Sequence, residues 1–91
     1  MRAKRRRRPT HPGELLREET LPAVGLTPSE LAARLGVSQR GINALLHEHR
    51  SVSPDFAHRL ARVFKTTPEF WLRLQEAVDI WDAWQANRQE I

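Results

Sequence analysis

The sequence predicts an all-α protein, a bundle of five helices. Apolar residues recur at intervals of three and four along the chain, a capping residue or a proline stands at the start of each periodic stretch, and no stretch alternates apolar and polar residues as a strand does. With 91 residues, the chain has room for one domain with one core. We therefore expect helices over residues 12–21, 27–35, 39–47, 54–64 and from 68 onward.

The boundaries of the first two helices follow from local chemistry. Pro12 fits the first position of a helix, and this first amphipathic segment is expected to end before Pro22. Thr27 and Glu30 have the spacing of a capping box, in which the hydroxyl accepts from the amide three residues on and the carboxylate reaches back. Gly36 then supplies the permissive conformation at which helices commonly end.

The other three helices have similar start signals. Ser38 is expected to cap the third helix, which keeps its helical apolar spacing despite Gly41, a residue that costs about 1 kcal/mol relative to alanine. Ser53 before a proline begins the fourth helix, and Thr67 before a proline begins the fifth and longest.

Residues 27–47 have the layout of a helix-turn-helix. Two short helices flank a Gly-Val-Ser turn, with the cap chemistry and apolar spacing of that motif. Gln39 and Arg40 in the first turn of the second helix, and Asn43 one turn on, are polar side chains that can bond adenine or guanine edges in a major groove. The spacing by itself also fits an alternative to a DNA-binding motif, a helical hairpin whose polar face is only solvated.

The string LTPSELAARLGVSQRGINALL resembles the helix-turn-helix of the Cro/repressor-like (XRE) regulators. HPGELLREE before it, SPDFAHRLARVFKTTPEFWLRLQ after it and the VDIW beyond are similar to the HigA family of antitoxins, also described as VapI-like, over about residues 11–84. The resemblance implies a repressor-like fold and a dimeric antitoxin that binds its own palindromic operator of two half-sites. It also implies a partner, a HigB-like toxin that is a RelE-like nuclease cutting messenger RNA on the ribosome.

Carried over by position, the family's DNA contacts fall on the predicted motif and its flanks. The major-groove set is Gln39, Arg40 and Asn43, with His47 as a further candidate, and the phosphate set is Thr27, Ser29, Ser38 and Arg50. The chain departs from the family's usual pattern at Glu48 and His49, where many members have a glycine and then a basic residue. It departs again at Gly41, where a larger side chain is usual. Glu48 and His49 predict a different turn into Arg50, and Gly41 removes one side chain from the DNA-facing surface.

Positive charge is concentrated at the N-terminus. Residues 1–8 contain six basic residues and no acidic one, so the net charge of +4 becomes negative for the rest of the chain. This predicts a mobile, disordered basic arm over residues 1–9, followed by a folded domain over residues 10–91. The arm is either a solvated tail or a segment that follows DNA, and both interpretations stay open.

The apolar residues of the last helix cover roughly half of its circumference, wider than the stripe of about 100° that packing on one core requires. The excess predicts a partner surface. Because symmetric dimers commonly read two half-sites, we expect a homodimer that uses Ile80, Trp81 and Trp84.

The sequence indicates neither a catalytic site nor a metal site, so we expect that the protein is not an enzyme and that it binds no cofactor and no metal. The chain has no cysteine, and His47 and His49 are two positions apart and do not share a helix face. The serines are explained by caps and turns, and no glycine-rich phosphate loop is present. No apolar run reaches the length of a membrane span or of a secretion signal, which favours a cytoplasmic protein that makes no membrane contact.

Three functions fit these observations: the antitoxin, a stand-alone XRE-type repressor without a toxin, and an interaction protein without DNA activity. The first two share every DNA-facing residue. For the antitoxin, two acidic surfaces could complement a basic toxin, and the sequence does not choose between them. They are the first helix, with Glu14, Glu18 and Glu19, and the acidic C-terminal third of the chain.

Overall fold

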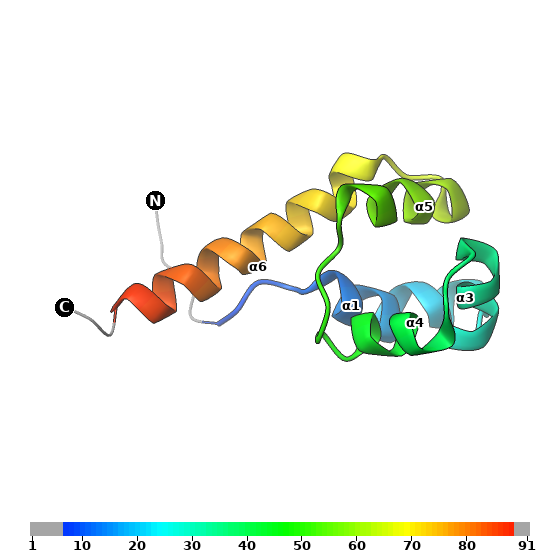
Figure 1. The fold of residues 1–91 in the computed structure, drawn as a ribbon, viewed down its shortest axis with the longest axis horizontal. Coiled ribbons are helices and arrows are strands. Elements are labelled where there is room, and N and C mark those ends of the chain that lie inside the picture. The colour runs from blue at the N-terminus through cyan, green and yellow to red at the C-terminus, as the bar shows by residue number, and fades with distance from the viewer. Residues whose placement is uncertain (1–6, 89–91) are drawn as a thin grey trace.

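The computed structural model describes residues 7–88, and this part of the chain is entirely helical (Figure 1). The elements are α1 (Pro12–Leu15), η1 (Leu16–Thr20), α2 (Leu21–Val24), α3 (Pro28–Leu35), α4 (Gln39–Leu46), α5 (Pro54–Phe64) and α6 (Pro68–Arg88). The first three follow one another without a break and form one helical segment. The predicted all-α bundle of five helices is therefore confirmed.

The predicted end of the first helix before Pro22 is wrong. A π-helical turn over η1 ends with the N–H of Leu21 bonded to the carbonyl of Leu16, and Pro22 then lies in the first turn of α2. Pro22 has no N–H to continue the regular hydrogen-bond ladder, and the π-helical turn immediately before it is where that ladder is irregular, so the segment continues through the proline. The segment ends instead at Gly25, whose φ of 74° lies in the left-handed region.

The predicted caps of the later helices are present. The hydroxyl of Thr27 accepts from the Glu30 N–H at 3.1 Å, and the Glu30 carboxylate accepts from the Thr27 N–H at 2.9 Å. The hydroxyl of Ser38 accepts from the Gly41 N–H at 3.0 Å, and that of Ser53 from the Phe56 N–H at 3.2 Å. These bonds satisfy amides that have no partner within the helix.

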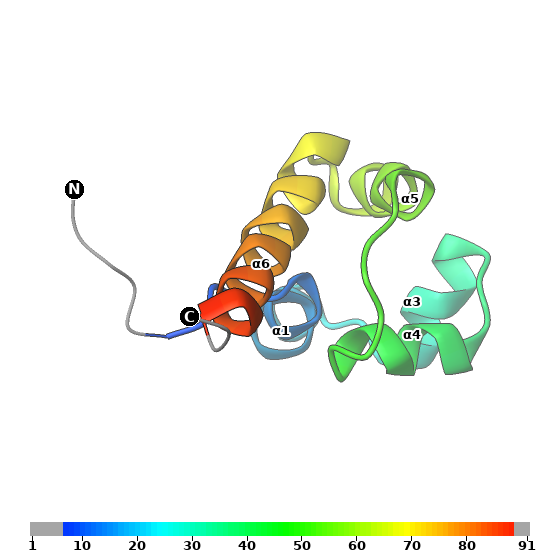
Figure 2. The same ribbon diagram turned by 60° about the vertical axis from the view of Figure 1, so that its left-hand side comes forward.

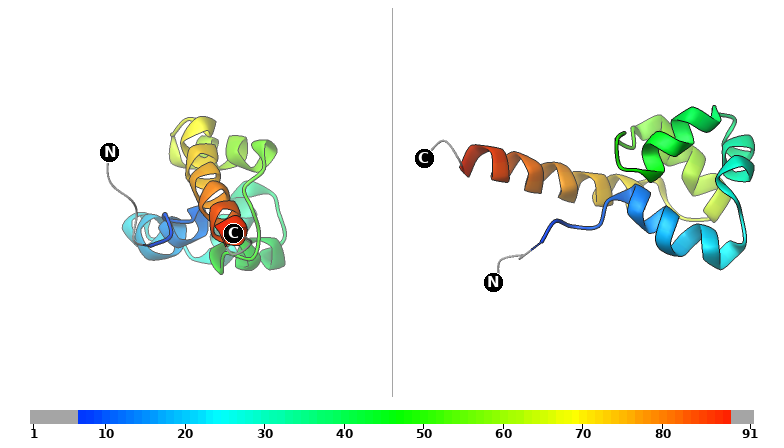
Figure 3. Two further views of the ribbon diagram at one scale, coloured as in Figure 1. Left: turned by 90° about the vertical axis from the view of Figure 1, so that its left-hand side faces the viewer. Right: turned by 90° about the horizontal axis from the view of Figure 1, so that it is seen from below.

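One core joins all the helical segments. Its fully buried large side chains come from four helices and the first segment: Leu16, Leu31, Ile42, Leu45, Leu60 and Trp71. α3 and α4 pack against each other, and α5 lies across the core from α4 (Figure 2). The distal half of α6 projects from this body, at the opposite end of the long axis from α3 (Figures 1 and 3).

The first helical segment approaches α4 very closely at Gly13. A Cβ added to Gly13 would lie 1.8 Å from the carbonyl oxygen of Leu45, so only glycine fits this contact. Beside it, the buried His11 caps α1 by accepting the Gly13 N–H at its Nδ1, 2.9 Å away. Burial lowers the pKa of His11, because the charged imidazolium is less well solvated there.

At Arg8 and Pro9 the structure differs from the predicted mobile arm. Pro9 is buried, and the Arg8 guanidinium pairs with Asp82 of α6 at 2.7 Å and with Glu48 at 3.1 Å. The hydrogen bond from Arg8 lowers the pKa of Asp82. Residues 1–6 of the predicted arm lie outside the described residues. Within residues 7–88, no helix has both the length and the apolar character needed to cross a membrane.

Candidate nucleic-acid interface

The α3–turn–α4 unit separates an apolar inner face from a polar outer face. Gly36 adopts a φ of 73°, and the N–H groups of Gly36 and Val37 both bond to the carbonyl of Ala32, which closes the end of α3. Ala32 and Ile42 are buried in the common core. The two short helices are thus locked to the body, and the side chains left outside are polar.

The predicted base-reading residues lie together on the exposed face of α4. Gln39 and Arg40 occupy its first turn, Asn43 lies one turn on, and His47 follows four positions later as the C-terminal cap. All four side chains are exposed. Residues three or four apart in a helix share a face, so these side chains form one row. The His47 ring continues it, with Nδ1 2.9 Å from the Asn43 carbonyl oxygen.

The predicted phosphate-contacting hydroxyls lie at two helix starts. Thr27 caps α3 and Ser38 caps α4, and Ser29 is exposed in the first turn of α3. The capping bonds use the lone pairs of Thr27 and Ser38, so each hydroxyl keeps its hydrogen for donation to an external acceptor. The capping bond from the Thr27 N–H lowers the pKa of Glu30, which therefore stays ionised in this first turn.

Arg50 lies beside the start of α4, although it follows that helix in sequence. Its guanidinium lies over the Phe56 ring, 5.0 Å from the centroid, which holds the side chain in place. A Cβ added to Gly41 would lie 2.7 Å from Arg50 Nη1. Gly41, one of the two departures from the family's pattern, therefore makes the space that Arg50 occupies against the outer face of α4.

The other departure from the family's pattern includes Glu48, in the turn after α4, and it changes the backbone of this turn less than a glutamate in place of a glycine suggests. Glu48 has a φ of 65°, a left-handed conformation that favours glycine, so the backbone there has the shape expected of the family's usual residue. The Glu48 carboxylate pairs with Arg8 at 3.1 Å and with Arg17 at 3.5 Å. These two ion pairs give the side chain a role that a glycine could not have.

Three positioning residues were missed by the sequence reasoning. The Arg17 guanidinium donates to the Leu46 carbonyl at the end of α4, and the Arg59 guanidinium donates to the Leu35 carbonyl at the end of α3, at 2.7 Å. The buried Gln75 of α6 accepts the Val52 N–H at 2.9 Å and so fixes the linker after α4. Each contact joins residues more than 20 positions apart, so no local pattern signals it.

The side chains predicted for a dimer contact lie on the projecting half of α6. Ile80 is 62% exposed and Trp84 is 46% exposed, whereas Trp81 is half-buried. The Trp81 and Trp84 rings lie 5.4 Å apart, and Arg88 stacks over Trp84 at 4.8 Å. Elsewhere, residues 7–88 contain no group of three or more side chains suited to holding a metal ion.

A polar helix face presented by a helix-turn-helix on an apolar core defines a class of DNA-binding proteins. The helix-turn-helix family model matches residues 16–71. Antitoxin HigA-1 of Vibrio cholerae is 38% identical over 87 residues, covering 96% of this chain and 82% of that protein. The Escherichia coli HTH-type transcriptional regulator YbaQ is 45% identical over 76 residues, covering 84% of this chain and 67% of that protein.

Among solved structures, that of the Pseudomonas aeruginosa antitoxin HigA with the higBA promoter superposes with a TM-score of 0.86 at 41% identity. It covers 91% of this chain and 90% of that one. The chain belongs to the HigA family of XRE-type helix-turn-helix proteins. The resemblance stated from the sequence is thereby confirmed, and the family is one of DNA-binding antitoxins and regulators rather than enzymes.

Proposed function

We propose that the protein is the antitoxin of a type II toxin–antitoxin pair, which represses its own operon and neutralises a RelE-like, mRNA-cleaving toxin by binding it. The observation that carries the DNA-binding half is the exposed polar row on α4, made of Gln39, Arg40 and Asn43. The likeness to the structure of P. aeruginosa HigA with promoter DNA also supports this DNA-binding half of the proposal.

In this proposal, α4 enters the major groove and its first two turns read the bases. The Arg40 guanidinium donates two hydrogen bonds to a guanine edge, and Gln39 and Asn43 use their amides on adenine edges. His47 lies at the end of the same row and reaches the groove wall. These contacts set the sequence preference of the protein.

The phosphate contacts fix how α4 enters the groove. The hydroxyls of Thr27, Ser29 and Ser38 donate to phosphate oxygens, and Arg50 adds a positive charge that Phe56 holds beside α4. Removing one of these contacts is expected to weaken binding to all sequences alike, because phosphates carry no sequence information.

A homodimer completes the operator complex in this proposal. Two copies related by a two-fold axis read two half-sites one helical turn apart, about 34 Å. The contact between the copies is supplied by apolar side chains on the projecting half of α6: the exposed Ile80 and Trp84 and the half-buried Trp81.

The antitoxin half of the proposal requires no catalytic residue, because a bound partner is inhibited by covering its surface. The likeness to HigA-1 of V. cholerae supports this half. The likeness to the regulator YbaQ supports a second candidate, a stand-alone repressor that uses the same α4 face without a toxin.

Two measurements test the proposal. Co-expression with the protein encoded by the adjacent gene is expected to restore growth and to yield a complex of the two proteins. If neither occurs while specific binding to its own promoter is intact, the stand-alone repressor is correct.

For the DNA half, Arg40→Ala is expected to lose roughly 1–3 kcal/mol of specific binding to the promoter fragment. Arg62→Ala removes an exposed arginine from α5, outside the proposed interface, and serves as the matched control. Equal affinities of the two variants for the promoter would contradict the proposed role of α4.

A further inference from the structure

We infer that the surface that binds the toxin is a groove along α6, and that its occupant is a basic segment of the toxin with apolar side chains at its centre. This inference rests on the proposed antitoxin function and adds to it the surface and the chemistry of the contact. Sequence alone left two acidic surfaces equally eligible for this role.

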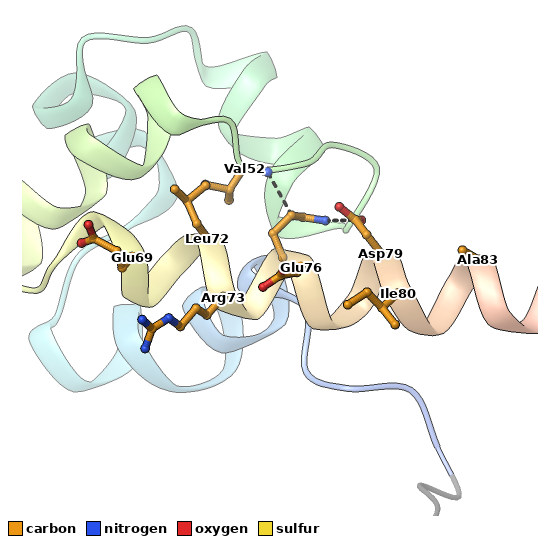
Figure 4. A pocket seen from close by; sticks show the side chains of 9 residues that line it. Val52, Glu69, Leu72, Arg73, Glu76, Asp79, Ile80 and Ala83 are labelled. Atoms are coloured by element: carbon orange, nitrogen blue, oxygen red, sulfur yellow. Dashed lines mark hydrogen bonds between the residues drawn. The ribbon is translucent and has the colours of Figure 1, made fainter.

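The groove combines an apolar floor with an acidic rim. It has a volume of about 500 Å³ and lies between α6 and the linker that follows α4 (Figure 4). Its apolar lining comes from Val52, Leu72, Ile80 and Ala83. The side chain of Ile80 is 62% exposed and lies at the edge that the groove shares with the proposed contact between copies, so an occupant of the groove and a second copy meet at this residue.

The charges around this floor are mostly negative. Glu69, Glu76 and Asp79 line the groove together with a single base, Arg73 (Figure 4). The Asp79 carboxylate accepts a hydrogen bond from the Gln75 amide at 3.0 Å, which orients it without neutralising it. A segment with two or more lysines or arginines complements this rim, whereas an acidic or nucleic-acid ligand is repelled.

The proposed partner has the matching charge. A nuclease that cuts messenger RNA must attract a polyanion, and a surface that does so is rich in lysine and arginine. Covering part of that surface with the acidic rim of the groove blocks RNA from it, which is a direct route to neutralisation. The apolar floor supplies affinity that salt does not screen.

The acidic first helix fits this role less well. The Glu18 carboxylate is paired with Arg17 at 2.9 Å, and Glu14 is half-buried, so only part of that charge is free to meet a partner. A second groove on α6, beside Phe70 and Ala77, is lined by one acid, Glu69, and one base, Arg73, and offers no net charge to a basic segment.

The groove also leaves the proposed DNA-reading face uncovered. The row of side chains on α4 is exposed on a different element, and the groove residues outside the linker all belong to α6. Glu76 lies outside both the α4 row and the proposed contact between copies, so Glu76→Arg is expected to leave DNA binding unchanged. Binding to the promoter then serves as an internal test that this variant is folded.

The test measures the affinity of the purified product of the adjacent gene for the full chain and for three variants. Glu76→Arg reverses one charge on the rim and is expected to weaken binding at least tenfold, with a slower association at low salt. Ala83→Trp fills the groove without a change of charge and is expected to weaken binding as well. Glu19→Arg makes the same charge reversal on the first segment, at an exposed position, and is expected to bind as the unmodified chain does.

The outcomes separate this inference from the function on which it rests. If the unmodified chain binds the partner and Glu76→Arg binds equally well, or if Glu19→Arg is the weakened variant, the groove is not the docking surface although the antitoxin function stands. If Glu76→Arg instead converts a dimer to a monomer in light scattering and keeps the partner bound, a second copy of this chain covers the groove. If the unmodified chain does not bind the partner at all, the antitoxin function itself fails.

Discussion

Replacement of Gly13 by alanine tests whether the position of α4 depends on its close contact with the first helical segment. A Cβ at this position would lie 1.8 Å from the Leu45 carbonyl oxygen, whereas ordinary contact begins near 3.4 Å. The two helices would have to separate by about 1.6 Å. The obstacle is backbone, and no side-chain rotation can relieve it.

The expected cost follows from that geometry. Overpacking in a core costs about 1–3 kcal/mol, and the upper end applies because the Leu45 carbonyl also accepts the Glu48 N–H at 2.9 Å, a bond that the shift would stretch. Alanine favours the helix by up to about 1 kcal/mol over glycine, which offsets part of this cost. The net loss in the free energy of unfolding for Gly13→Ala is therefore about 2 kcal/mol, and the melting temperature should fall by about 8–16 °C.

Urea denaturation and thermal melts measure this loss, and promoter binding measures whether α4 keeps its position. The control is Gly25→Ala, where the added Cβ meets open space and the only cost is the left-handed backbone with its φ of 74°. That control should lose about 1 kcal/mol and bind the promoter normally. A Gly13→Ala protein as stable as the unmodified chain would refute the close-contact reasoning.

Three further outcomes are expected. Gly41→Ala should leave the free energy of unfolding unchanged or raise it by up to about 1 kcal/mol, because alanine favours a helix over glycine. It should nevertheless weaken promoter binding, because the added Cβ displaces Arg50. Anisotropy titrations that show full affinity for the promoter would contradict this. Lys65→Gly should raise the free energy of unfolding by about 0.5–1 kcal/mol, since Lys65 has a φ of 58°, and a lower urea midpoint would count against it. Because burial lowers the pKa of His11, the unfolded chain takes up the proton first on acidification. Stability should therefore be lost as the pH falls from about 6.5 through the folded-state pKa, and His11→Asn should reduce this loss in urea titrations across that range.

The sequence predicts the helix starts well because their chemistry is local. Thr27, Ser38 and Ser53 each bond an amide three residues ahead, so residue type and spacing are sufficient to locate the cap. The row of Gln39, Arg40 and Asn43 follows from the same logic, since helical periodicity alone decides which residues share a face.

Local chemistry fails where a contact joins distant parts of the chain. Pro22 looks like the end of a helix, and only the π-helical turn before it reveals that the helix continues. The same limit applies to Arg17 and Arg59, which bond the last carbonyls of α4 and α3 from other elements. Neither arginine differs in sequence from an ordinary exposed one, because its partner is a backbone oxygen more than 20 positions away.

The two acidic surfaces show why charge counts along a sequence cannot locate a docking site. Both clusters carry several carboxylates, but what each offers a partner depends on the cations and the apolar area that folding brings beside it. Arg17 pairs with Glu18 in the first segment and Arg73 lies among the acids of the groove, so the two surfaces differ less in charge than in the exposed isoleucine, Ile80, that lines the groove. Charge attracts a partner, but buried apolar area holds it once salt screens the charge. The α6 surface has both, and for this reason Glu76→Arg and Glu19→Arg, identical in charge, are expected to differ in their effect on the toxin.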